Sequence, residues 1–247
     1  MTEMTPDTGT EPGEHRRRGL LVGIGALVAV VAIAVAIYLV TRDDGSSEQT
    51  ATTSTQATTT DAQTTVPVDT STAVWPFASS ATRYPDPVSA ARGFATEYVG
   101  FTNPVVGNFR AGDARSGEVP VQGKSTGPIT TVLVRQLGDS WWVLGASTPN
   151  IQLSAPAALS AISSAVRLQG TSTAFEATVN TEVRADGSTQ PIGTGIVMGG
   201  ANGELGPFDG TLSFTRPPTA SGGLTLLTRS AEDGSVTEAT VVRVTFA

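Results

Sequence analysis

Side chains suited to acid–base and nucleophilic chemistry are sparse in this chain. It has no cysteine and one histidine, His15, which precedes a long apolar run. Serine–histidine and cysteine–histidine nucleophile systems are therefore excluded beyond that run, and zinc loses its best ligands. What remains is carboxylate chemistry of the glycoside-hydrolase kind, for which residues 74–149 offer Glu97, Asp113, Glu118 and Asp139. None stands in a recognisable motif, so the sequence predicts a protein that is not an enzyme and holds no metal or cofactor.

Four aromatic residues are the candidate contacts to a ligand or partner: Trp75, Phe77, Trp141 and Trp142. Adjacent residues of a strand point to opposite faces of a sheet, so Trp141 and Trp142 do not share one core. An exposed ring at this place would suit a sugar, a lipid or a partner protein. The alternative is structural: the Trp75-Pro76-Phe77 segment folds back over the outward ring, or the sandwich described below covers it.

The region that carries these residues, 74–149, is expected to be a small α+β domain. Asp86 is a suitable N-cap and Pro87 a suitable first helical residue. Apolar residues then recur at helical spacing up to Gly100, a plausible stop. Gly138-Asp139 is a tight-turn signal between two strands. The expected strands are 118–122, 129–137 and 140–144.

Residues 150–247 show an all-β pattern. Apolar and polar residues alternate over 175–184, which predicts a half-buried strand whose polar face includes Glu182 and Arg184. Short strands and turn signals at intervals of about ten residues predict a β-sandwich. The other expected strands are 166–169, 192–198, 208–214, 224–229 and 240–246.

Several short motifs in this region also follow one another at suggestive spacing. They are Ser154-Ala155-Pro156, Val166 to Gly170, Ala174 to Val179, Asp186-Gly187, Gly206-Pro207-Phe208 and Ser230 to Ser235. This set resembles the immunoglobulin-like domain of bacterial spore germination proteins over residues 150–247. The resemblance implies a non-catalytic immunoglobulin-like sandwich in an exported envelope protein.

The run from Gly19 to Val40 is uncharged and predicts a membrane helix. At about 1.5 Å per residue it is roughly 33 Å long, which exceeds a hydrocarbon core of about 30 Å. Three arginines precede the run, so the positive-inside rule places residues 1–18 in the cytoplasm and 41–247 outside. The run is too long for a cleaved signal peptide and lacks a cleavage site. We therefore expect a retained signal anchor in the plasma membrane.

Composition defines the flanking segments and the class of partner. Residues 1–18 are expected to be a disordered tail, and the Thr-rich residues 41–73 a disordered linker spanning about 30 Å on average. Beyond the anchor the chain contains 12 Lys and Arg and 18 Asp and Glu, because three of the 15 basic and four of the 22 acidic residues precede Gly19. The resulting net charge of −6 disfavours nucleic acid as a partner. A single lysine among many arginines suggests a high-GC, actinobacterial source.

These observations favour a membrane-anchored binding or scaffolding protein of the cell envelope. Its expected partner is another envelope protein or a cell-wall glycan. One alternative is a small-ligand protein that binds a lipid or glycan in a cavity beneath the helix of the α+β domain. A second is a carboxylate hydrolase with two acidic side chains about 5–10 Å apart.

Overall fold

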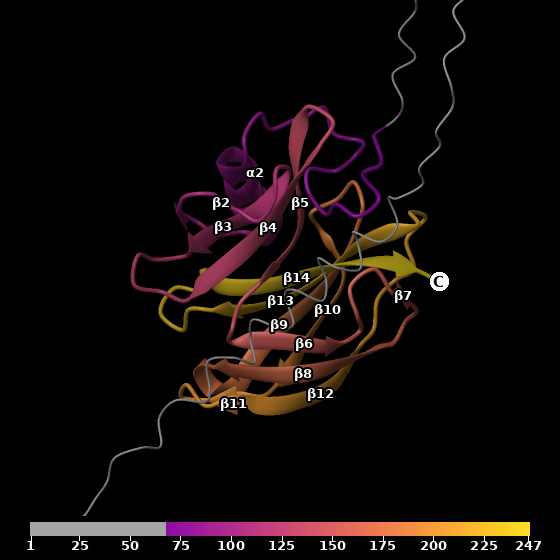
Figure 1. The fold of residues 1–247 in the computed structure, drawn as a ribbon. Coiled ribbons are helices and arrows are strands. Elements are labelled where there is room, and N and C mark those ends of the chain that lie inside the picture. Colours follow the sequence, from indigo (N-terminus) through magenta and orange to yellow (C-terminus); the bar gives the residue numbers. More distant parts are fainter. Residues whose placement is uncertain (1–67) are drawn as a thin grey trace, which may run out of the picture. The chain divides into compact units, whose positions relative to one another are not determined.

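The computed structural model describes residues 68–247. The predicted tail, the predicted membrane helix 19–40 and the predicted linker up to residue 67 lie outside the described residues. Between residues 68 and 247, no helix is long and apolar enough to cross a membrane. This part of the chain is mostly β, with one short α-helix (Figure 1).

Two sheets account for most of the regular secondary structure between residues 68 and 247. The larger has ten strands along the path β1-β3-β4-β5-β14-β13-β9-β10, with β2 beside β3 and β7 beside β14. The smaller has four strands, in the order β11-β8-β12 with β6 beside β8. The strand bounds are β1 Val105–Val106, β2 Arg110–Ala111, β3 Ser116–Gln122, β4 Ile129–Leu137, β5 Ser140–Ser147, β6 Ile151–Ala155, β7 Ala161–Ile162, β8 Val166–Ala174, β9 Thr178–Ala185, β10 Pro191–Met198, β11 Gly200–Ala201, β12 Gly206–Leu212, β13 Ser221–Arg229 and β14 Val236–Phe246.

The predicted sandwich is present. Strands β6, β8 and β12 of the smaller sheet pack against β9, β10, β13 and β14 of the larger one (Figure 1). The apolar cluster between them includes Leu168, Phe208, Val183 and Leu224, which are all buried. Every strand expected between residues 166 and 246 has a counterpart within a few residues of its predicted bounds.

The helix begins and ends where its capping residues predict. The Oδ1 atom of Asp86 accepts the Ser89 N–H at 2.8 Å, and this bond lowers the pKa of the Asp86 carboxyl. The α-helix α2, Pro87–Gly93, continues as a π-helical segment over Phe94–Val99. Gly100 then stops it at φ +93°, a left-handed conformation that glycine adopts without strain.

A second apolar cluster lies between this helix and strands β3, β4 and β5. Strands β13 and β14 contribute to both clusters, because successive side chains point to opposite faces. Leu226 and Val244 point into the sandwich, whereas Leu227 and Val241 belong to the cluster under the helix. The described residues belong to one compact unit. The predicted boundary between residues 149 and 150 stays a prediction, although β5 and β14 of the two regions pair at Ala146 and Val241.

Two expectations for the strand 175–184 were wrong. The strand begins at Thr178, because Glu176 and Ala177 adopt left-handed conformations with φ 53° and 59°. Its polar face is also not solvent-exposed: Glu182 is 8% and Arg184 7% exposed. The end of the helical segment covers that face, and local alternation carries no information about such a distant element.

Candidate binding surface

Trp75 and Phe77 lie in the segment 68–86, which runs beside β5 before the helix starts. The Val143 N–H donates to the Trp75 carbonyl at 2.7 Å, so this segment adds a bridge to the edge of β5. The Trp75 ring meets Phe77 edge-on at 5.2 Å between centroids. Its indole N–H donates to the Tyr84 hydroxyl at 3.2 Å. These contacts make Trp75 part of the core and leave Phe77 half-buried.

Trp141 and Trp142 point to opposite faces of β5, as adjacent strand residues must. Trp141 is half-buried and packs edge-on against Phe109, with 5.3 Å between centroids. Trp142 is 3% exposed, and the Arg83 guanidinium lies 4.9 Å from its ring centroid. Arg83 belongs to the segment 68–86, so that segment covers the outward ring.

The structure thus brings Trp75 and Phe77 together and separates Trp141 from Trp142. Trp75 and Trp142 have almost no accessible surface, whereas Phe77 and Trp141 keep some. Contact with a ligand or partner stays a prediction for these four residues. Phe77 has the best position, since it borders a surface hollow.

A buried ionic network fixes the helical segment to β9, and sequence reasoning missed it. The Arg184 guanidinium donates to the Tyr98 carbonyl and to Glu182, with 3.0 Å between Nε and Oε2. It also lies 5.0 Å from the Tyr98 ring centroid. Each charge of this network is therefore paired within the fold. Its signal in the sequence would have been two opposite charges at alternate positions of one strand.

Glu238 on β14 is a second buried charge, surrounded by neutral donors. It accepts hydrogen bonds from the Thr148 hydroxyl, from Asn150 at 3.3 Å and from the Thr228 hydroxyl at 3.3 Å. Burial outweighs these donors and raises the pKa of the Glu238 carboxyl. Thr148 and Asn150 flank the junction of the two regions, so the carboxyl holds that junction to β14.

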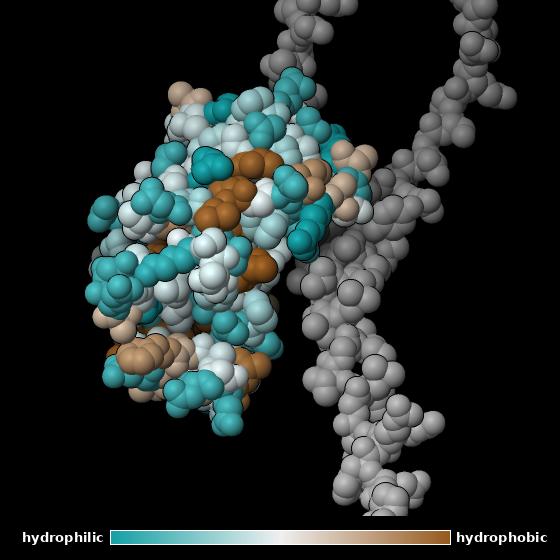
Figure 2. Space-filling model, turned by 90° about the vertical axis from the view of Figure 1, so that its left-hand side faces the viewer, coloured by the Kyte–Doolittle hydropathy of each residue, from teal (hydrophilic) through white to brown (hydrophobic). Residues whose placement is uncertain are grey.

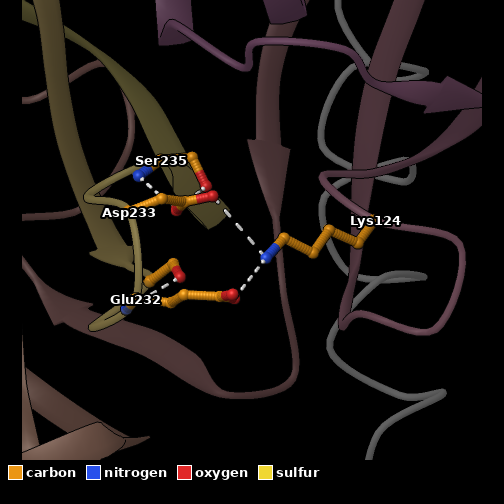
Figure 3. A network of polar contacts seen from close by, with 5 residues as sticks. Lys124, Glu232, Asp233 and Ser235 are labelled. Carbon is orange, nitrogen blue, oxygen red and sulfur yellow. Dashed lines mark hydrogen bonds and ion pairs between the residues drawn. The ribbon is translucent and has the colours of Figure 1, made fainter.

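Polar contacts on the surface also connect the two regions. Figure 3 shows Lys124, from the β3–β4 connection, reaching Glu232 at 3.2 Å and Asp233 at 3.7 Å in the β13–β14 connection. Hydrogen bonds from Ser235 lower the pKa of Asp233 to about 2. All three charged side chains are about half exposed or more, so this is a solvated ion pair rather than a binding site.

The sandwich exposes large apolar side chains at one end. Phe175 is 67%, Ile196 60%, Met198 56% and Leu205 50% exposed. We call these four residues the apolar end. Figure 2 shows exposed apolar residues at the level of β8, β11 and β12, the lower part of the molecule in that view.

Strand pairing brings the segments of the apolar end together. Phe175 follows directly after β8, and two left-handed residues separate it from β9. Ile196 and Met198 lie two positions apart on β10, and so on one face of it. Three strand pairings and one backbone hydrogen bond join these segments. The pairings are Met198 with Thr178, Gly200 with Thr173 and Gly206 with Ser172. The hydrogen bond runs from the Gly199 N–H to the Ala177 carbonyl, at 3.1 Å.

The charges around the apolar end are acidic. Glu176 and Glu204 are exposed beside Phe175 and Leu205. Neither 168–183 nor 185–215 contains a lysine or arginine. A partner with apolar groups flanked by cations therefore complements this surface.

The four carboxylates proposed for hydrolysis, Glu97, Asp113, Glu118 and Asp139, lie on four different elements or connections. Asp113 accepts the Arg115 N–H at 2.7 Å and the Ser116 hydroxyl at 2.6 Å, which lowers the pKa of its carboxyl. Within residues 68–247, no three acidic or histidine side chains are grouped to hold a metal ion.

The geometry of residues 150–247 is a two-sheet sandwich with apolar residues on the inner faces. Residues 150–235 match the family model of the immunoglobulin-like domain of bacterial spore germination. The predicted resemblance is confirmed over this range. The strand pairing of this region continues beyond the match, because β14 pairs with β13 from Val236 to Thr245. This is a non-catalytic type of fold. Neither curated proteins nor solved structures give a match to the chain.

Proposed function

We propose that this chain is a membrane-anchored, extracytoplasmic binding or scaffolding protein of an actinobacterial-type cell envelope. Immunoglobulin-like sandwiches present binding groups at their ends on a rigid platform. The observation that carries the proposal is the apolar end, where Phe175 is 67% exposed. Anchoring through Gly19 to Val40 would hold that surface outside the membrane.

The backbone before β9 supports a binding role for Phe175. Left-handed conformations at Glu176 and Ala177 cost on the order of 1–3 kcal/mol each. A continuous strand would avoid that cost and bring Phe175 into the ladder. The turn instead projects the ring into solvent, which favours contact with a second molecule.

The partner of the apolar end is, in this proposal, another envelope protein whose contact surface is apolar with a basic rim. Such a surface would bury Phe175 and Met198 and pair its cations with Glu176 and Glu204. A photoreactive amino acid at position 175 of the full chain, in its native membrane, tests this. The proposal expects one discrete cross-linked protein from position 175 and none from the exposed position Gln190. Equal products from both positions, or none from position 175, would contradict it.

The proposed membrane orientation needs a separate test. Because the chain has no cysteine, an introduced thiol is the only one that can be labelled. Gln190→Cys and Thr10→Cys each introduce one thiol into the full chain. A membrane-impermeant maleimide should label Gln190→Cys in intact cells and label Thr10→Cys only after lysis. The reverse pattern, or labelling of both in intact cells, would overturn the proposed orientation.

A further inference from the structure

A hollow of about 390 Å³ opens at the surface between the segment 68–78 and the larger sheet. Asp186, Ser221 and Arg243 line its sheet side. No residue of α2 lines it, so it differs from the cavity expected beneath the helix. Its volume lies at the lower end of the range of about 300–1,000 Å³ for small-molecule sites.

The charged wall of the hollow is rigid. Arg243 is only 6% exposed, and its guanidinium pairs with both carboxylate oxygens of Asp186, at 2.7 Å for Nη2 and Oδ2. Its Nε–H donates to the Ser71 carbonyl at 2.9 Å. The wall therefore presents a fixed set of polar atoms to the hollow, and these side chains lose little conformational entropy when a ligand binds.

The opposite wall combines a half-buried aromatic ring with small polar groups. Phe77 lines the hollow, and its ring is oriented by Trp75 at 5.2 Å and Tyr98 at 6.1 Å between centroids. Thr70 and Ser71 line the same wall and supply hydroxyl groups. Asp69 adds a carboxylate that accepts the Ser71 N–H at 2.9 Å.

These groups select the chemistry of a ligand. Two carboxylates, Asp69 and Asp186, outnumber the one cation, Arg243, which is already paired; phosphates and other anions are therefore disfavoured. Hydroxyl donors, carboxylate acceptors and an apolar ring together match a molecule with many hydroxyl groups and one C–H face. We propose that the hollow binds a neutral saccharide, with Phe77 against the C–H face of one ring.

This inference does not rest on the proposed function, because none of the residues of the apolar end lines the hollow. With the photoreactive amino acid placed at position 198 instead, Phe175→Ser should abolish the cross-linked partner and leave saccharide binding intact. The failure of one proposal is therefore distinguishable from the failure of the other.

The test is a titration of the full chain with triacetylchitotriose and maltotriose, followed by saturation-transfer NMR and tryptophan fluorescence. We expect at least one of these neutral saccharides to bind and to change the emission of Trp75, beside Phe77. Trigalacturonic acid, an anionic saccharide of similar size, should bind at least tenfold more weakly. No binding by either neutral saccharide, or equal binding of the anionic one, would overturn the proposal.

Two variants locate the binding without disturbing the core. Ala78 is exposed and lines the hollow, so Ala78→Arg fills the hollow from its rim. Ser79→Arg adds the same charge at the next exposed residue, which is not part of the lining. We expect Ala78→Arg to lower the affinity at least tenfold and Ser79→Arg to leave it unchanged within twofold. Undiminished binding by Ala78→Arg would contradict the assignment.

Discussion

The hydroxyl oxygen of Tyr98 lies 2.1 Å from the point where a Cβ atom would stand on Gly223. Tyr98 is at the end of the helical segment and Gly223 is on β13, so the missing side chain lets the two elements approach. The hydroxyl has no hydrogen-bond partner among the described residues, and burial raises the pKa of Tyr98 to about 12. This contact is where the helical region closes over the outer face of the sandwich.

Gly223→Ala should therefore destabilise the fold, because the added methyl group meets the Tyr98 hydroxyl in a packed interior. Overpacking of this kind costs about 1–3 kcal/mol. Tyr98→Phe removes an unpaired buried hydroxyl and should leave stability unchanged or raise it. In the double variant the hydroxyl is absent, and the nearest atom of the ring at position 98 is Cζ, 3.3 Å from the new Cβ. A small shift can accommodate that distance.

Chemical denaturation of the two single variants and the double variant measures the coupling between these positions. We expect the double variant to recover most of the loss caused by Gly223→Ala, with an interaction energy of about 1 kcal/mol or more. Additive effects would show that another contact limits the space at Gly223.

The buried pair of Arg184 and Glu182 gives a second prediction. Arg184→Met leaves the buried Glu182 carboxylate with only the more distant, partly exposed Arg229, at 3.8 Å, and leaves the Tyr98 carbonyl without its donor. Breaking such a pair costs about 3–5 kcal/mol, whereas replacing both charges by apolar groups costs less. Glu182→Leu combined with Arg184→Met should therefore be more stable than Arg184→Met alone, as measured by thermal unfolding.

Lys124→Met is the matched control for that experiment. It also removes a cation from an ion pair, but Lys124 and Glu232 are 53% and 82% exposed. Its unfolding midpoint should stay at the wild-type value. A loss as large as that of Arg184→Met would show that burial does not determine the cost of breaking these ion pairs.

The contrast between these ion pairs also shows how far the sequence could predict the structure. Local signals were sufficient for the helix, since Asp86, Pro87 and Gly100 act on their own backbone. The periodicity of β9 could not predict that Glu182 and Arg184 are buried, because the covering residue, Tyr98, lies more than 80 positions away. Alternation along a strand indicates that one face of the sheet is buried, but it cannot indicate that a further element covers the other face.

The candidate sites were predictable to a smaller degree. The adjacent positions of Trp141 and Trp142 predicted their opposite faces, but the residue that lies over the Trp142 ring is Arg83, which the sequence did not single out. The exposure of Phe175 was not predicted, since its position in an alternating run favours an inward side chain. Two non-glycine residues in left-handed conformations turn it outward, and neither carries a sequence signal for that geometry.

Glu238 should make stability depend on pH in the direction opposite to that of most carboxylates. Because burial raises its pKa, the folded chain holds the Glu238 proton more tightly than the unfolded chain does. Stability contributed by this group is present below the ordinary pKa of 4.5 and is lost as the pH rises through the folded pKa. Glu238→Gln should remove that loss, so the difference in stability between the variant and wild type should grow in favour of the variant with rising pH.

Urea denaturation between pH 4.5 and pH 7.5 checks this, since Asp86, Asp113 and Asp233 have lowered pKa values and titrate below that range. Those groups contribute stability above pH 3.8 that is lost only in stronger acid. Asp113→Asn is the control, and its difference from wild type should stay constant over the range. A constant difference for Glu238→Gln as well would show that Glu238 titrates normally.

Substitution of Phe175 distinguishes a binding role of this residue from a structural one. Its side chain is 67% exposed, so Phe175→Ser should change the free energy of unfolding by no more than about 0.5 kcal/mol. Phe208, in the same sandwich, is 3% exposed, and Phe208→Ser should cost at least about 3 kcal/mol. If Phe175→Ser destabilises the fold as strongly, the ring is part of the core and the apolar end loses its main residue. If stability is unchanged while cross-linking from the neighbouring position Met198 falls, the exposed ring serves a partner.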